Sequence, residues 1–415
     1  MPERPFIRLV CGLAALLIGA LPASLPLAAQ DLSGYFKNFS VGFHMPPALS
    51  TEDALWQVAN RLRLKYRRGF RKQATLEAAW EISPRFQSPA LLGISPLGFS
   101  RNASAYRVVD PRPGLVPCRA CAPGRFSLYQ NLDRLSFTWA ASKADIIVGR
   151  QAISWGSARV INPTDVIAPF AFNDLDKEDV YGVDALRVRI PTASLNEVDL
   201  GYVAGHDFNL NQSAFFVRSR SEIRHTDVAI TLGVFRKNVL AGVDISRSLG
   251  QMGFTLEAAH VAPDAGGGPA ARRHYTRVSV GLDRSLSSRL YGYVEYHFNS
   301  AGASDAGEYF ERLWTPAYTT GNVYLLGRHY LSAGASYQAT GLHGFRGLVI
   351  ANLTDGSFSL SPSWEFNLTT NSYLSAGAYI GIGGGVPPAL GPIPRFRSEF
   401  GAYPDIFYAS YRHYF

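Results

Sequence analysis

The sequence predicts an all-β fold: a transmembrane antiparallel β-barrel of about 18 strands that follows a cleaved N-terminal signal peptide. Three observations predict it. The first residues have the layout of an export signal, apolar and polar residues alternate along many short segments, and the chain ends in an aromatic stretch, 405–415, that stops on phenylalanine. A barrel leaves no open sheet edge, so this last strand is expected to pair with the first.

Residues 1–29 are predicted to be the signal peptide. Arg4 and Arg8 give a positive start, an unbroken apolar run covers 9–21, and small residues lead to a cleavage site after Ala29. The run is too short to span a membrane as a helix. Residues 30–415 are then one domain, the outer-membrane β-barrel, because no plug-like or second domain can be recognised in them.

The composition fits a barrel with aromatic girdles at both membrane interfaces, since the chain contains 21 Tyr, 25 Phe and 39 Gly. The formal net charge is +8, and 34 of the 40 basic residues are Arg. Arginine is weakly hydrated and holds anions with a planar fork, which suits a confined wall. Nucleic acid is not an expected partner, because the basic residues are dispersed through the strands of an exported chain.

The period-2 alternation is clearest in 56–67 and 358–368. In the first segment Trp56, Val58 and Leu62 alternate with Arg61 and Arg63, so that one face suits lipid and the other a wet lumen. About 16 strands remain if the two weakest patterns, 33–43 and 213–219, are dropped. The predicted strands are 33–43, 56–68, 72–83, 126–139, 144–153, 182–190, 195–205, 213–219, 224–235, 237–247, 251–261, 273–284, 287–299, 325–338, 342–353, 357–367, 371–382 and 405–415.

The connections between these strands fall into two groups. Short links near 141–143, 191–194, 285–286 and 368–370 are typical of periplasmic turns. The long Gly- and Pro-rich connections 84–125, 154–181, 300–324 and 383–404 all fall at the opposite end, where they either face the outside or fold into the lumen.

If apolar positions face lipid, the alternate positions point inward, and the predicted lumen has one mainly basic and one mainly acidic wall. Such walls orient dipolar solutes, and the Arg excess predicts mild anion preference. Alternatively, many of these charges pair across neighbouring strands. The pore-lining candidates are Arg61, Arg63, Arg67, Arg134, Arg150, Arg187, Arg189, Arg218, Arg220, Arg277, Glu257, Asp283 and Glu295. Further inward charges are Lys65, Glu77 and Glu81 on early strands, and Asp227, Asp244, Arg346, Glu365 and Arg412 on later ones.

The connection 154–181 is the most distinctive. It combines Trp155-Gly156, the turn sequence Asn162-Pro-Thr-Asp165 and a charged run at 173–179. A connection of this length is usually functional or mobile. Trp155, Asn162 and Asp165 are therefore constriction-loop candidates. Infolding into the barrel is favoured over capping of its mouth.

A resemblance appears here. The Gly149-Arg150-Gln151 strand followed by Trp155-Gly156 and the Asn-Pro-x-Asp loop resembles a group of Gram-negative outer-membrane proteins that contains the alginate-export porins. The resemblance implies a barrel of about 18 strands that moves solutes or a polysaccharide. It offers only Arg150, Trp155 and Asp165 as candidate binding residues.

Two cysteines remain after signal cleavage, Cys118 and Cys121. One CxxC pair cannot complete a zinc site and has no redox context, so a small loop disulfide is the preferred interpretation, with metal or redox roles as alternatives. No metal or cofactor is predicted, and no motif of a known catalytic site is recognised.

Taken together, these features favour a porin-like channel in the bacterial outer membrane that passes small polar or anionic solutes through an Arg-rich lumen. One alternative is an export channel for an anionic exopolysaccharide, and another is an outer-membrane enzyme or adhesin that acts through its long loops. The expected partners are outer-membrane lipid, the solute, the barrel-assembly machinery through the C-terminal strand, and further copies of the chain in a homo-oligomer.

Overall fold

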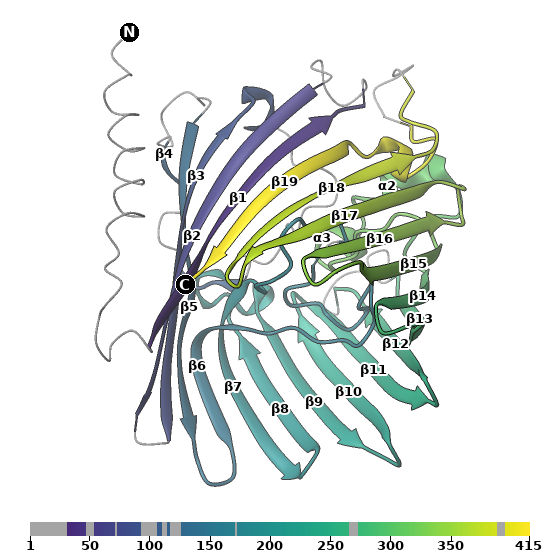
Figure 1. Cartoon of the computed structure of the whole chain (residues 1–415). Helices are drawn as coiled ribbons and strands as arrows, with labels where there is room; N and C mark the ends of the chain where they lie inside the picture. The colour runs from purple at the N-terminus through teal and green to yellow at the C-terminus, as the bar shows by residue number, and fades with distance from the viewer. Residues whose placement is uncertain are drawn as a thin grey trace.

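The computed structural model describes residues 31–46, 54–70, 73–92, 106–109, 114–116, 126–170, 172–264, 273–387 and 395–415. The predicted signal peptide and both Cys118 and Cys121 lie outside these residues. Within them, one antiparallel sheet closes on itself as a barrel (Figure 1). Its strands are β1 (Leu32–His44), β2 (Ala54–Phe70), β3 (Ala74–Gln87), β5 (Phe126–Ala140), β6 (Asp145–Ala152), β7 (Gly182–Ala193), β8 (Asn196–Val203), β9 (Ala214–Glu222), β10 (Thr226–Phe235), β11 (Asn238–Leu249), β12 (Met252–Ala262), β13 (Tyr275–Ser285), β14 (Leu290–Asn299), β15 (His329–Gln338), β16 (His343–Asn352), β17 (Phe358–Thr369), β18 (Ser372–Ile382) and β19 (Asp405–Tyr414).

These 18 barrel strands confirm the predicted fold class and strand count. Every predicted strand is present, including 33–43 and 213–219, and the ends differ by a few residues. One further strand was not predicted: β4 (Gly114–Val116) pairs with the part of β5 around Leu128. That part of β5 extends beyond the residues that pair with β6, so the edge of β5 that faces β6 is free there to pair with another strand.

Closure occurs between the first and last strands, as the C-terminal pattern predicts. β1 pairs with β19 from Tyr35–Tyr414 to His44–Asp405. Phe415 and Gly34 also exchange both backbone hydrogen bonds, at 2.8 and 3.0 Å. The backbone polar groups of both strands are therefore satisfied, as a membrane-embedded sheet requires.

Successive side chains of a strand point alternately to the outside and to the inside of the barrel, as predicted. On β5, Leu135, Phe137 and Trp139 are 46–51% exposed on the outside, whereas the inward Arg134 and Ser136 are 7% and 6% exposed. Apolar residues also fill much of the inside near the long connections, where buried clusters surround Trp155, Tyr330 and Tyr309. The inside is therefore a packed region as well as a polar one.

A β-bulge interrupts the alternation between β3 and β5. Ala79 pairs with Arg134 and Trp80 pairs with Leu132, so Asp133 is an extra residue on β5. Asp133 and Arg134 both become buried as a result. This bulge gives the wall an inward carboxylate directly beside an inward guanidinium.

The connections form two groups, as predicted. Turns of a few residues join the strands at one end, which for β5 to β12 lies at the bottom of Figure 1, and the long connections lie at the other. The helices that the structure describes in the long connections are all short. These are η1 (Pro89–Leu92), η3 (His206–Phe208), η4 (Leu210–Gln212), η6 (Ala306–Glu308), α2 (Tyr309–Arg312), α3 (Pro316–Thr319) and η7 (Phe400–Ala402). Among the described residues, no helix has the length and apolar character needed to cross a membrane.

Candidate functional site

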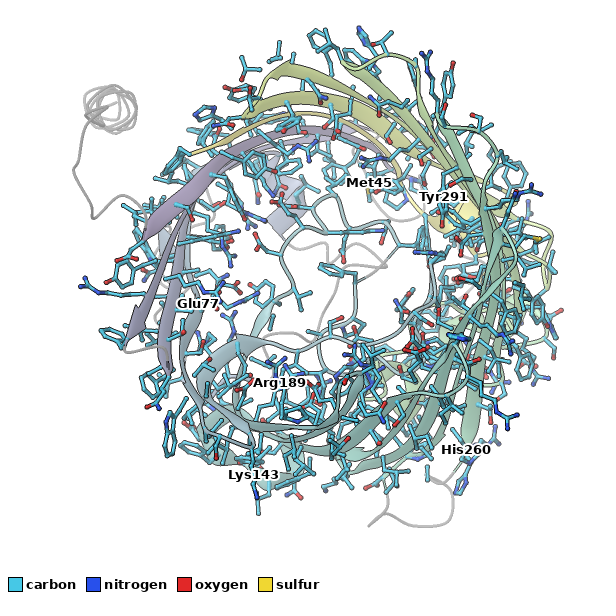
Figure 2. The ribbon with its side chains drawn as sticks, turned by 60° about the horizontal axis from the view of Figure 1, so that its bottom comes forward. Met45, Glu77, Lys143, Arg189, His260 and Tyr291 are labelled. Carbon is cyan, nitrogen blue, oxygen red and sulfur yellow. The ribbon has the colours of Figure 1, made fainter. Side chains whose placement is uncertain are left out.

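The candidate site is the lumen and the chain that crosses it, residues 153–170 and 172–181, here called the inner segment. It leaves β6, turns at the Asn-Pro-Thr-Asp sequence, where the Asp165 N–H donates to the Asn162 carbonyl at 3.3 Å, and returns to β7. Figure 2 looks in from the short-turn end: chain crosses the lumen inside the ring of strands, and Glu77 and Arg189 lie on the inner side, whereas Lys143 and His260 lie outside.

Two wall carboxylates hold the first half of the inner segment by its backbone. Glu295 on β14 accepts from the N–H groups of Arg159, Val160 and Ile161 at 2.6, 3.1 and 3.0 Å. Glu257 on β12 accepts from the Ser157 and Ala158 N–H groups at 3.2 and 3.3 Å, and from Thr164 as well. Both glutamates are inward and at most 1% exposed. They anchor the segment because charge-assisted hydrogen bonds to backbone N–H groups are strong.

Neighbouring wall charges reinforce this anchor. Arg277 donates to the Pro163 carbonyl at 2.6 Å. Asp283 pairs with Arg159 at 3.1 Å, and Asp244 accepts from the Ser157 hydroxyl. The acidic side of the wall is therefore covered by the inner segment, and its charge is largely directed at that segment.

The second half of the inner segment carries the charged run, which meets the basic side of the wall. Asp176 accepts from Lys37 at 3.0 Å and from Arg61 at 2.8 Å. Asp179 pairs with Lys65 at 3.2 Å, and the Tyr35 hydroxyl donates to it at 2.9 Å. Lys37 is completely buried and also pairs with Glu178 at 2.6 Å. The inner segment thus supplies carboxylates to cations that an anionic solute would otherwise meet.

The bulge carboxylate of Asp133 gathers three guanidinium groups. Arg63 donates to it at 2.7 Å and Arg107 at 3.3 Å, and Arg134 also donates to it. The Asp133 oxygen that accepts from Arg107 also accepts the Gly182 N–H at 2.8 Å, at the start of β7. Arg63 additionally pairs with Glu81 at 2.7 Å. This buried network joins β2, β3, β5 and β7 and does not leave Arg63 or Arg134 facing open lumen.

The remaining pore-lining candidates on β6 to β9 are mostly paired as well. Arg150 pairs with Asp184 at 2.7 Å, Arg187 with Asp199, Arg189 with Asp145 at 3.3 Å, and Arg218 with Asp244 at 3.2 Å. Two pore-lining candidates, Arg67 on β2 and Arg220 on β9, are exposed at inward positions of their strands. The cross-strand pairing that the sequence left open as an alternative is thus present for most of these residues.

The constriction-loop candidates are packed within the inner segment or between it and the wall. The Trp155 ring meets Phe216 at 4.7 Å between centroids, and the side chain is 6% exposed. Gly156 lies so close to Asn162 that a side chain there would overlap it. Asp165 accepts from the Ser154 hydroxyl at 2.5 Å, and burial raises its pKa to about 6. Trp155 and Asp165 therefore shape the segment, and Arg150 is likewise buried against Asp184.

The long connections are joined by a second buried network around Glu399, which is fully buried near η7. Glu399 accepts from the Asn352 amide at 2.8 Å, the Leu326 N–H at 2.9 Å and the Tyr403 hydroxyl at 3.1 Å. Tyr330 also donates to it. Burial raises the pKa of Glu399 to about 7, and the nearby Asp355 carboxylate acts in the same direction, whereas the hydrogen bonds that Glu399 accepts lower its pKa.

Several residues of these networks could not be predicted from the sequence. Lys37 and Asp133 carried no visible signal, because a single Lys in an apolar strand and a bulge both look ordinary in a period-2 pattern. The charged run at 173–179 was visible, but its partners were not. The described residues contain no group of three or more His, Cys, Asp or Glu side chains placed to hold a metal ion.

Comparisons with known proteins place the fold. No family model matches the chain, and neither does any curated protein sequence. Among solved structures, Pseudomonas aeruginosa OccK5 (OpdH) is 10% identical, with a TM-score of 0.59, over 92% of this chain and 97% of that chain. A BenF-like porin from Pseudomonas fluorescens Pf-5 is 9% identical, with a TM-score of 0.58, over 92% and 98%. Pseudomonas aeruginosa OpdK with vanillate is 8% identical, with a TM-score of 0.54, over 93% and 98%.

These structures show that the chain shares the fold of Gram-negative outer-membrane porins. They support the porin-like part of the sequence resemblance and do not single out the alginate-export group. The closed sheet and apolar outer face agree with an outer-membrane location, because barrels of this kind satisfy every backbone group within the bilayer. The chain has the fold of the outer-membrane porins.

Proposed function

We propose that the chain is an outer-membrane channel for small polar solutes, with mild preference for anions. One observation carries the proposal: a closed barrel whose lumen is narrowed by a segment anchored at both walls. An anchored constriction of this kind selects among small solutes by size and charge, which an open barrel does not. The porins with the same fold, including the one described with vanillate, support a transport role over an enzymatic one.

The anion preference is expected from the excess of basic over acidic residues in the chain. The chain carries a formal net charge of +8, and the carboxylates of Asp133, Asp176 and Asp179 are matched by lumen cations. The excess of basic residues is then expected to favour anions at the two entrances. Arg67 and Arg220 fit this role because they are exposed on inward faces.

Export of a polysaccharide is a weaker proposal for this geometry. A polymer needs a continuous open path, and the inner segment occupies the middle of the lumen. Recognition of the C-terminal strand by the barrel-assembly machinery and formation of homo-oligomers are proposed from the sequence, and cross-linking in intact cells tests both.

Uptake by proteoliposomes tests the channel proposal. Purified protein in vesicles is expected to admit small carboxylates faster than neutral sugars of similar size, while vesicles without protein admit neither. Vesicles that stay impermeable to all small solutes would contradict the channel function. Faster entry of organic cations than of carboxylates would contradict the anion preference.

A further inference from the structure

Two histidines lie side by side on the outer face of the barrel, at the end that carries the long connections. His260 is near the end of β12, and His274 directly precedes β13. Their chain neighbours Ala259, Val261 and Tyr275 are buried on the inside, so by alternation both histidines point outward. Both are exposed, and Figure 2 shows His260 outside the ring of strands. These two imidazoles therefore take no part in the lumen.

The spacing of the two rings suits a shared metal ion. Nε2 of His260 is 3.3 Å from Nδ1 of His274, and the ring planes are inclined at 62°. Two imidazole nitrogens on a tetrahedral zinc ion, each 2.0–2.1 Å from the metal, are about 3.3–3.4 Å apart. Right-angle coordination at the same bond length would bring them to about 2.8–3.0 Å. The observed separation thus matches tetrahedral coordination.

Thr276 orients one of the two rings. It is the direct partner of His260 in the ladder between β12 and β13, and its hydroxyl is 2.9 Å from Nδ1 of His260. When Nδ1–H donates to this hydroxyl, Nε2 keeps a free lone pair that faces His274. Histidines that bind metals usually donate their other ring N–H to such a partner, which fixes the tautomer and the ring orientation. The supporting hydrogen bond of a metal ligand is therefore already present.

The donor set selects the kind of ion. Imidazole nitrogen suits zinc, copper and nickel, whereas magnesium and calcium prefer oxygen ligands. Among the described residues no third His, Cys, Asp or Glu joins the pair, so water fills the other positions and the ion stays exchangeable. The same distance also allows a hydrogen bond between the two rings. The two arrangements differ in whether zinc binds.

We propose that His260 and His274 form a zinc site on the outer rim of the barrel, with Nε2 of His260 and Nδ1 of His274 as the protein ligands. The ion ties the end of β12 to the residue that precedes β13, one position beyond the last ladder pair, Val261–Tyr275. The short turns of such barrels face the periplasm, so this rim faces the outside of the cell. The site is separate from the lumen and does not depend on the channel function.

Titration calorimetry with zinc tests the site, on the full barrel purified in detergent without a polyhistidine tag. The natural protein is expected to bind a single zinc ion per chain and no magnesium. His260→Ala and His274→Ala are each expected to weaken zinc binding by roughly tenfold or more, because one protein ligand is left. Thr276→Val keeps both ligands but removes the supporting hydrogen bond, and is expected to weaken binding by about tenfold.

His329→Ala is the matched control. His329 is an exposed histidine at the same end of the barrel, and its Nδ1 contacts the Tyr296 hydroxyl at 2.7 Å. This variant is expected to bind zinc as the natural protein does. Zinc is also expected to protect His260 and His274, and not His329, from diethyl pyrocarbonate, as mapped by mass spectrometry. Absence of zinc binding in the folded natural protein, unchanged affinity in His260→Ala, or equal loss in His329→Ala would each overturn the assignment and leave a hydrogen-bonded pair only.

Discussion

Glu257 of β12 accepts two hydrogen bonds from Thr164, one from its backbone N–H and one from its hydroxyl, both at 2.7 Å. Thr164 belongs to the turn of the inner segment, and Glu257 is completely buried beneath it. A carboxylate on the barrel wall therefore fixes the chain that crosses the lumen. With Glu295 acting in the same way further along, the position of the constriction depends on two side chains of the wall.

Replacing Glu257 is expected to loosen the inner segment. Glu257→Gln puts an amide N–H₂ where a carboxylate oxygen now accepts, so buried donors face each other, at a cost of about 1–3 kcal/mol. Single-channel recording is expected to show larger and noisier conductance, and hydrogen exchange at 157–164 to become faster. Asp227→Asn, an inward acid away from the segment, is the control. Unchanged conductance in Glu257→Gln would show that the segment is held by other contacts.

Neutralising the charged run is expected to release wall cations. In Asp176→Asn/Glu178→Gln, Lys37 and Arg61 lose their carboxylate partners inside the lumen. The ratio of chloride to potassium permeability, measured from reversal potentials, is expected to rise. Asp207→Asn changes an exposed acid in η3 and is expected to leave the ratio unchanged. A fall in the ratio in the double variant would contradict the arrangement described here.

Removing the bulge carboxylate is expected to destabilise the barrel. Asp133→Ala leaves Arg63, Arg107 and Arg134 without their shared acceptor in a buried place, and loss of one partner of a buried charge network costs about 3–5 kcal/mol. Urea unfolding in lipid vesicles measures the change. Asp145→Asn, in a part-exposed pair with Arg189, is expected to cost less than about 1 kcal/mol. Equal effects of the two substitutions would refute the special role of Asp133.

The Glu399 network is expected to weaken as pH rises. Burial raises the pKa of Glu399 from 4.5 to about 7, so the folded state holds its proton more tightly than the unfolded state. Its contribution is complete below pH 4.5 and is lost as pH rises through about 7. Asp355 is the charged group next to it, bonded to the Glu399 N–H at 2.8 Å, and Tyr330, Tyr403 and Asn352 are its other side-chain partners.

Hydrogen exchange in the connections 309–327 and 395–403, compared at pH 5 and pH 8 after correction for intrinsic rates, measures this effect. Protection is expected to be greater at pH 5 in the natural protein. Glu399→Gln, which is neutral throughout, is expected to show no such difference. The same pH dependence in both proteins would assign it to another group, such as Asp165.

The barrel could be predicted from the sequence because its strands obey a local rule. Every second side chain contacts hydrocarbon, so the pattern in segments such as 358–368 reports directly on the sheet. The short β4 escaped prediction, because three residues are too few to show a period. The bulge could not be predicted for a related reason. Strict alternation from the inward Arg134 would place the Asp133 side chain in lipid, and the extra residue of the bulge turns it inward instead.

The site was less accessible to prediction. Inward positions such as Arg61, Glu257 and Glu295 follow from alternation, but their partners do not. Lys37 and Asp176 are 139 residues apart along the chain, and only the infolding of the inner segment brings them together. The sequence therefore predicts which residues point inside, whereas the charge that remains free there depends on tertiary pairing.

The central claim is that this barrel is a narrow, mildly anion-selective channel. The reversal potential of the purified protein in a planar bilayer under a potassium chloride gradient tests it most directly. We predict stepwise ion conductance and a reversal potential shifted towards the equilibrium potential of chloride, which means that chloride is the more permeant ion. A membrane without conductance steps, or a reversal potential shifted towards the equilibrium potential of potassium, would contradict the claim.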